Sequence, residues 1–132
     1  MRPLASAAVI AALAALAACQ SKPSAPVSQP SGKSAALRNM EMVAKAAHKC
    51  WFASRDPAFR EYSFANELNS FTGRPRFLLV PKGNFGGRPL LVVQAEGSAG
   101  QVSAFGPMLD TAAAPRISAD IERWRRGNDS CA

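Results

Sequence analysis

The feature that most limits what this chain can fold into is an uncharged stretch at its start. Residues 4–18 contain no charged side chain, and Arg2 before them supplies one positive charge. The stretch is 15 residues long, whereas a helix that crosses a bilayer needs about 20 residues. A short apolar segment with a positive start and small residues at its end is typical of a secretory signal peptide. We therefore predict that residues 1–18 are removed on export, and that only the remainder folds.

The end of this stretch has a more specific pattern. The residues Leu16-Ala17-Ala18-Cys19 resemble the lipobox of bacterial lipoprotein precursors, in which lipid is attached to the cysteine thiol and cleavage falls just before it. The resemblance implies that Cys19 is the lipidated first residue of the mature protein, which its acyl chains anchor to a membrane. Gln20 follows where an Asp would mark retention at the inner membrane, so the resemblance favours the outer membrane, facing the periplasm. The alternative is an ordinary signal peptide in which Cys19 is a chance residue.

The segment after the lipobox has the composition of a spacer. Residues 20–34 contain three prolines and five serines, and Val27 is their one large apolar side chain. Such a segment cannot bury a core and favours an extended, solvated backbone. A chain of 132 residues allows one domain. We therefore divide it into a signal peptide at 1–18, a lipidated Pro/Ser-rich tether at 19–34 and a single globular domain at 35–132.

The cysteine count agrees with export. If Cys19 is lipidated, Cys50 and Cys131 are the two cysteines that remain, and in an oxidising compartment such a pair normally forms a disulfide. Closing a loop of 82 residues would stabilise the fold by about 4.5 kcal/mol in the chain-entropy description. Two free thiols or a metal-binding pair is the alternative, although no His or further Cys lies at ligand spacing.

Hydrophobic periodicity predicts an α+β domain with the order α-β-β-β-β-α. Residues 35–51 favour an amphipathic helix, and a C-terminal helix contains Ile117, Ile121 and Trp124 on one face, with Pro115 in its first turn and Gly127 at its end. Four strands lie between these helices, and their short connections favour an antiparallel sheet with both helices on one face. The disulfide would then require the two helices to be neighbours. The apolar face expected for the first helix consists of Leu37, Met40, Ala44, Ala47 and Trp51.

The strands differ in how clearly their patterns define them. Residues 77–80 and 90–93 are continuous apolar runs, which suits central strands buried on both faces. Residues 62–68 alternate between apolar and polar side chains, as a strand with one solvated face does, but a helix starting at Asp56 and Pro57 is an alternative for residues 57–68. The glycine-rich loop at 82–88 has phosphate-cradle composition but lacks the lysine and hydroxyl residue that follow the last glycine of a P-loop. A hairpin turn with glycines at positive φ fits it better.

No pattern in the sequence predicts catalysis. His48 is the one histidine, and helical spacing places it on the same face as Glu41 and Lys45, away from the predicted core. The nine acidic residues are scattered, so neither a pair of catalytic carboxylates nor a metal site is expected. We expect no catalytic residues, no metal and no cofactor.

The positive charge indicates anionic partners. The formal net charge is +7, and nucleic acid is the usual partner of so basic a protein, but an exported lipoprotein rarely meets it. Lys82 and Arg88, at one end of the central strands, are candidate contacts for an anionic envelope component, whereas Arg74 and Arg76 belong at the other end. General solubility is the simpler interpretation of these charges.

These observations lead to an ordered set of functional hypotheses. The first is a non-catalytic, membrane-anchored envelope lipoprotein that binds or scaffolds another envelope component. The second is a periplasmic binding module for a small or lipidic ligand held between the sheet and the helices, and a hydrolase is third. An enclosed apolar cavity would favour the ligand module, whereas a filled core with an exposed apolar or basic patch would favour a partner-binding surface.

Overall fold

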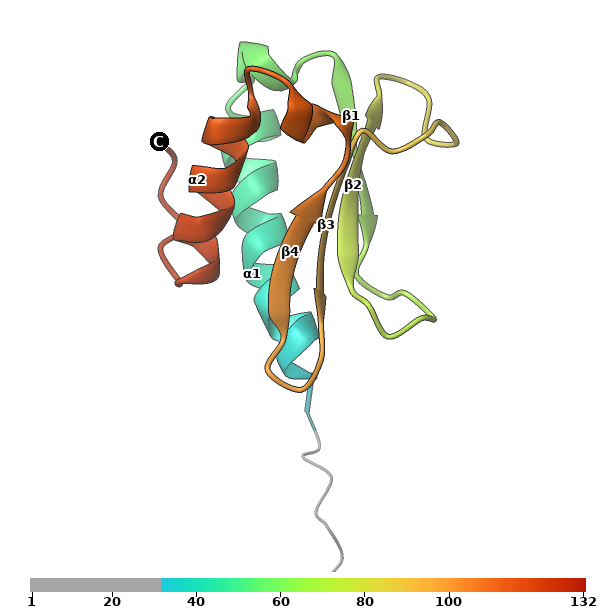
Figure 1. The fold of residues 1–132 in the computed structure, drawn as a ribbon, viewed down its shortest axis with the longest axis vertical. Helices are drawn as coiled ribbons and strands as arrows, with labels where there is room; N and C mark the ends of the chain where they lie inside the picture. Colours follow the sequence, from blue (N-terminus) through green and yellow to red (C-terminus); the bar gives the residue numbers. More distant parts are fainter. Residues whose placement is uncertain (1–31) are drawn as a thin grey trace, which may run out of the picture.

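The computed structural model describes residues 32–132, and the predicted signal peptide, Cys19 and most of the predicted tether lie outside the described residues. The predicted order of elements is confirmed (Figure 1). Three short helical segments join the main elements: η1 (His48–Ala53), η2 (Pro57–Phe59) and η3 (Pro107–Asp110). The main elements are α1 (Ala35–Ala47), β1 (Tyr62–Glu67), β2 (Arg76–Pro81), β3 (Leu91–Glu96), β4 (Gln101–Phe105) and α2 (Ala114–Arg125).

The four strands form one antiparallel sheet in chain order, β1-β2-β3-β4. Both helices lie on the same side of this sheet, as expected. Helix α1 contacts β2, β3 and β4, whereas α2 packs mainly on α1 and η3 (Figure 1). Among residues 32–132, no helix lies over the other side of the sheet. We call this helix-free side the outer face.

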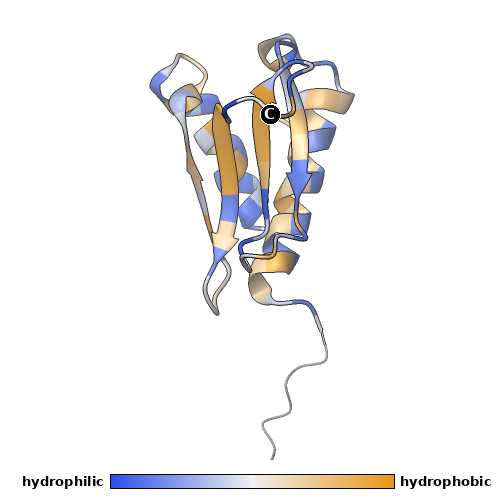
Figure 2. Cartoon of the chain, turned by 90° about the vertical axis from the view of Figure 1, so that its right-hand side faces the viewer, coloured by the Kyte–Doolittle hydropathy of each residue, from blue (hydrophilic) through white to orange (hydrophobic). Residues whose placement is uncertain are grey.

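The continuous apolar runs of the central strands are explained by cores on both faces of the sheet. Phe77 and Leu79 of β2 point toward the helices and belong to the main core. Leu78 and Val80, which alternate with them, belong to a small cluster on the outer face, together with Val92 of β3. The prediction that these strands are buried on both faces is therefore confirmed. Figure 2, with the outer side toward the viewer, shows the hydrophobic colour along the central strands.

Helix α1 buries a wider stripe than its periodicity predicted. Met40, Ala44 and Ala47 are buried as expected, but Leu37 is only half-buried, so its assignment to the buried face was wrong. Ala36 and Val43, which the pattern placed outside the stripe, are buried. The reason is that α1 lies between the sheet and α2 and therefore has two buried flanks.

The ambiguous segment after α1 contains both of the structures that its sequence allowed. Asp56 caps the short helix η2, its side chain accepting a 2.9 Å hydrogen bond from the Ala58 N–H, and Pro57 occupies the first position. The strand β1 then begins at Tyr62. Tyr62 and Phe64 pack against the main core, so the alternation correctly identified the strand.

A disulfide joins Cys50 to Cys131, with 5.3 Å between their Cα atoms, which confirms the predicted pairing. Cys50 lies in η1, a stretch of π-helix that directly continues α1, and Cys131 lies in the tail after α2. The two helices are neighbours, as this bond requires. The tail is held further by Trp124, whose indole N–H donates a 3.0 Å hydrogen bond to the Ser130 carbonyl.

One glycine is required by both backbone conformation and close packing. Gly106, after β4, has φ of 131°, and a Cβ there would lie 2.5 Å from the Leu90 carbonyl oxygen. A side chain would therefore be strained and would collide with backbone that cannot easily move. This close approach lets η3 fold back beside β3, where the Met108 N–H donates a 3.0 Å hydrogen bond to the same Leu90 carbonyl.

Candidate functional site

The space between sheet and helices is filled by side chains. Met40, Phe77, Leu79 and Trp124 are all 0% exposed in this main core. Four hollows of about 380 to 570 Å³ lie instead at the surface and are open to solvent. Any binding site in the described residues is therefore at the surface of the domain.

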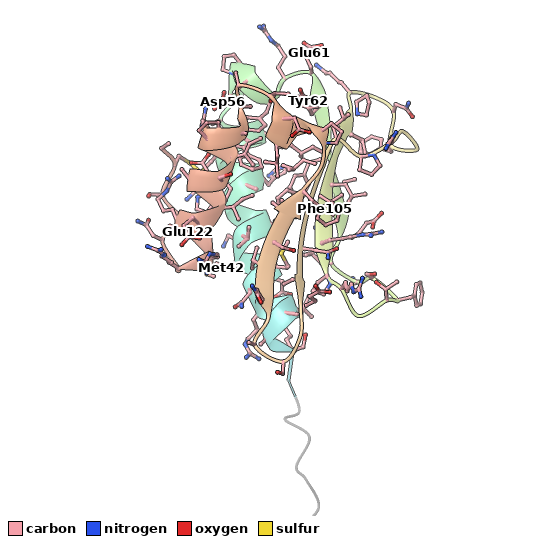
Figure 3. All side chains as sticks on the ribbon, viewed as in Figure 1. Met42, Asp56, Glu61, Tyr62, Phe105 and Glu122 are labelled. Atoms are coloured by element: carbon pink, nitrogen blue, oxygen red, sulfur yellow. A yellow bond between two sulfur atoms is a disulfide. The ribbon has the colours of Figure 1, made fainter. Side chains whose placement is uncertain are left out.

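The outer face presents an apolar centre. Leu78 and Val92, on adjacent strands, are each 8% exposed. Phe105 of β4 lies opposite Val92 and is 49% exposed. Figure 3 shows Phe105 beside the central strands. A half-exposed phenylalanine that extends a buried apolar cluster leaves apolar area in water which a partner could cover.

Two loops flank this centre with exposed aromatic side chains. Phe71, in the β1–β2 loop, is 108% exposed and Phe85, in the β2–β3 loop, is 66% exposed. The two loops project to the helix-free side at opposite ends of the sheet (Figure 1). We call Phe71, Phe85 and Phe105 together the outer surface. These three side chains border a region in which the sheet face is recessed between two projecting loops.

The candidate anion contacts Lys82 and Arg88 lie in the β2–β3 loop, on either side of Phe85. Neither forms an ion pair among residues 32–132. The basic residues at the other end of the strands are paired: Arg74 lies 3.1 Å from Glu96 and Arg76 lies 2.5 Å from Glu67. Lys82 and Arg88 therefore keep their charge available to a partner.

A buried carboxylate that the sequence analysis missed links the two helices. Asp120 of α2 is 1% exposed and accepts a 2.8 Å hydrogen bond from the Trp51 indole N–H. Its other oxygen accepts from Arg123. The sequence contained one indication of this carboxylate's role. Arg116 lies four residues before Asp120 and Arg123 three residues after it, so both share its face of the helix.

Asp56 extends this network toward η2. The Arg116 guanidinium lies 2.6 Å from the Asp56 carboxylate and also contacts Asp120. Burial opposes the charge on Asp56, but the Ala58 N–H and Arg116 outweigh it and hold the pKa of Asp56 below its ordinary value. Asp56 is thus a charged group at the N-terminus of η2, and its carboxylate is already bound to the Ala58 N–H and to Arg116.

His48 is exposed, as its helical position predicted. Its ring lies 5.5 Å from the ring of Phe64 in β1 and 6.3 Å from that of Phe52. It borders a groove of about 450 Å³ that also contains Glu41 and Lys45. Among the described residues the His48 side chain forms no hydrogen bond to a Ser, a Thr or a carboxylate.

Within residues 32–132 no three His, Cys, Asp or Glu side chains are grouped so that they could hold a metal ion. No helix in the same part of the chain is both long and apolar enough to cross a membrane.

No known protein family, curated protein or solved structure matches this chain.

Proposed function

We propose that this protein is a lipid-anchored, non-catalytic binding module of the bacterial cell envelope, attached through Cys19 and facing the periplasm. The outer surface binds another envelope protein. The signal peptide and the lipobox resemblance support the location, and the filled core supports a surface rather than an internal ligand cavity. The observation on which the proposal rests is the set of three exposed phenylalanines on the helix-free side of the sheet.

The shape and charge of the outer surface favour one class of partner. A flat bilayer would touch the two projecting loops before it reached the recessed Phe105, whereas a convex protein element could contact all three phenylalanines. Lys82 and Arg88 flank Phe85 without acidic partners of their own in the described residues. The complementary partner is a protein surface with an apolar centre and acidic groups at its margin.

The test is site-specific photocrosslinking in the intact envelope. A photoreactive amino acid at position 105 should capture one defined protein, and the same probe at the exposed position Ser118 on α2 should not. Adding Phe71→Asp and Phe85→Asp to the probe-bearing chain should abolish capture, because two of the three aromatic contacts are lost. Crosslinks that go only to lipid, or a product unchanged by these substitutions, would exclude a protein partner on this surface.

The anchor is tested separately. Cys19→Ala should prevent incorporation of labelled fatty acid and should release the exported protein from the membrane fraction. If the variant still incorporates the label, the lipobox interpretation is wrong.

A further inference from the structure

A second surface of the domain contains a hollow that the outer surface does not use. It measures about 380 Å³ and is bounded by the end of η1, by η2 and by the starts of β1 and of the β2–β3 loop. It lies at the end of the domain opposite the start of α1, where Figure 3 shows Asp56, Glu61 and Tyr62. Its lining residues are Trp51, Phe52, Arg55, Asp56, Pro57, Phe59, Arg60, Tyr62 and Lys82.

Three cations converge on this hollow. Arg55 and Lys82 form no ion pair among the described residues, and Arg60 has only Glu61 at 4.0 Å, with both side chains more than 70% exposed. Such an exposed contact leaves most of the Arg60 charge available. Asp56 is the one acid in the lining, and Arg116 already occupies it at 2.6 Å. The hollow therefore has a strong excess of positive charge.

The backbone fixes the points from which these three side chains extend. The Lys82 N–H donates a 3.0 Å hydrogen bond to the Glu61 carbonyl, which places the β2–β3 loop next to Arg60. Arg55 has φ of 59° and is the one non-glycine residue with positive φ in the described chain. Its N–H donates to the Phe52 carbonyl at 2.9 Å. A glycine would adopt this conformation without strain, so the arginine side chain is placed there at a conformational cost.

The remaining wall of the hollow is aromatic. Trp51 and Phe59 stack with ring centroids 4.4 Å apart, and Phe52 packs against Phe59 at 6.2 Å. The disulfide at Cys50 fixes the chain directly before Trp51. Two guanidinium groups and an ammonium group recognise phosphate oxygens through charge-assisted hydrogen bonds. Trp51 and Phe59 are each 1% exposed and support the wall from behind, so Phe52 and Tyr62 are the side chains that offer apolar area to whatever group the phosphate is attached to.

We infer that this hollow binds a phosphate group attached to a compact apolar or aromatic body. Arg55, Arg60 and Lys82 hold the phosphate, and Phe52 and Tyr62, both half-buried, contact the body. The volume is within the range of small-molecule sites. The same chemistry occurs in a soluble phosphomonoester and in a lipid headgroup, and the experiment separates these two sources.

The experiment uses the Cys19→Ala chain, which contains the whole folded domain. Calorimetric titrations with inorganic phosphate and with phenyl phosphate measure the soluble source. Cosedimentation with vesicles of phosphatidylcholine containing phosphatidic acid measures the lipid source. We expect phenyl phosphate to bind at least tenfold more tightly than inorganic phosphate, because the aromatic wall contacts only the former.

Matched variants separate a defined site from general attraction of anions. Arg60→Gln combined with Lys82→Gln should weaken binding at least tenfold, whereas Arg38→Gln combined with Lys45→Gln removes the same charge from α1 and should change it less than twofold. Arg55→Gly should also weaken binding while leaving the urea midpoint of unfolding unchanged or raised, because glycine relieves the positive φ.

Each result decides the inference. The ligand is soluble if the hollow variants, but not the control pair, lose binding of phenyl phosphate. It is a lipid headgroup if the hollow variants, but not the control pair, lose binding to the vesicles. The inference is overturned if neither probe binds, or if the control pair weakens binding as much as the hollow pair does. Lys82 is the one residue that both proposals use. Photocrosslinking at position 105 with the Phe71 and Phe85 substitutions leaves the hollow unchanged, so failure of either proposal leaves the other standing.

Discussion

Replacing Asp120 with Ala should lower the free energy of unfolding by about 3 kcal/mol. Asp120 is 1% exposed and accepts a 2.8 Å hydrogen bond from Trp51, which is itself 1% exposed. Without the carboxylate, the Trp51 N–H would stay buried with no acceptor. Residues 51 and 120 lie 69 positions apart in the chain, so this hydrogen bond exists only when α2 is docked against the end of α1.

Most of this loss in the free energy of unfolding comes from the Trp51 N–H that is left without an acceptor. A buried donor left without an acceptor costs about 1–3 kcal/mol, and a hydrogen bond to a charged group contributes about 1.5–3 kcal/mol. The side chains of Arg116 and Arg123 are 38% and 23% exposed, so water can solvate their guanidinium groups after the substitution. We therefore discount their contribution. Asp120→Asn keeps an oxygen acceptor for Trp51 and should cost about half as much as Asp120→Ala.

The assay is urea denaturation with the disulfide intact, followed by tryptophan fluorescence and by circular dichroism. A lower midpoint with an unchanged slope would show that stability, and not the unfolded state, has changed. Glu122→Ala is the matched control, because Glu122 is a half-exposed acid on the same helix, paired with Arg125 and Arg126. It should cost less than about 0.5 kcal/mol. If Asp120→Ala costs no more than this control, the buried hydrogen bond does not stabilise the fold as we reason.

Four further outcomes are expected. Replacing Cys50 and Cys131 together with Ala should lower stability by up to about 4.5 kcal/mol, and a urea midpoint equal to that of the native protein would contradict this. The pKa of Asp56 is lower in the folded state than its ordinary 3.8, so its stabilising effect is present above that value and is lost as the pH falls through the folded pKa. The stability gap between the native protein and Asp56→Asn should therefore narrow as the pH falls below 3.8; a gap that does not change with pH would contradict this. Gly106→Ala should destabilise more than Gly83→Ala, because a Cβ at position 106 meets the Leu90 carbonyl at 2.5 Å and one at position 83 meets nothing within 4 Å; equal thermal midpoints would refute the steric argument. His48→Ala should change the free energy of unfolding by less than about 0.5 kcal/mol and leave complementation of a deletion strain intact, and loss of complementation would identify a function for His48.

Where a feature depended on local pattern, the sequence was sufficient to predict it. The alternation around Tyr62 and Phe64 identified a strand because side chains on a strand alternate between its two faces. Pro115 near the start of α2 and Gly127 just after it were correct markers of the helix ends, and Gly127 has φ of 90°. The disulfide followed from counting cysteines, since only two remained once Cys19 was assigned to lipid.

Features that depend on how the elements dock could not be obtained this way. The burial of Val43 follows from α1 lying between the sheet and α2, and helical periodicity contains no information about a second neighbour. The hydrogen bond between Trp51 and Asp120 is a contact between distant positions, for which the charges at Arg116 and Arg123 were only an indirect signal.

The candidate sites show the same division. Sequence alone determined that Lys82 and Arg88 belong to one end of the central strands, because a hairpin brings the ends of its strands together. Only the tertiary structure places Arg55 and Arg60 beside Lys82, because this requires the π-helical end of α1, the turn at η2 and the start of β1 to meet the β2–β3 loop. Periodicity specifies which side chains share a face of one element. The docking of those elements, which maximises burial across the whole chain, decides which faces meet and which remain open to a partner.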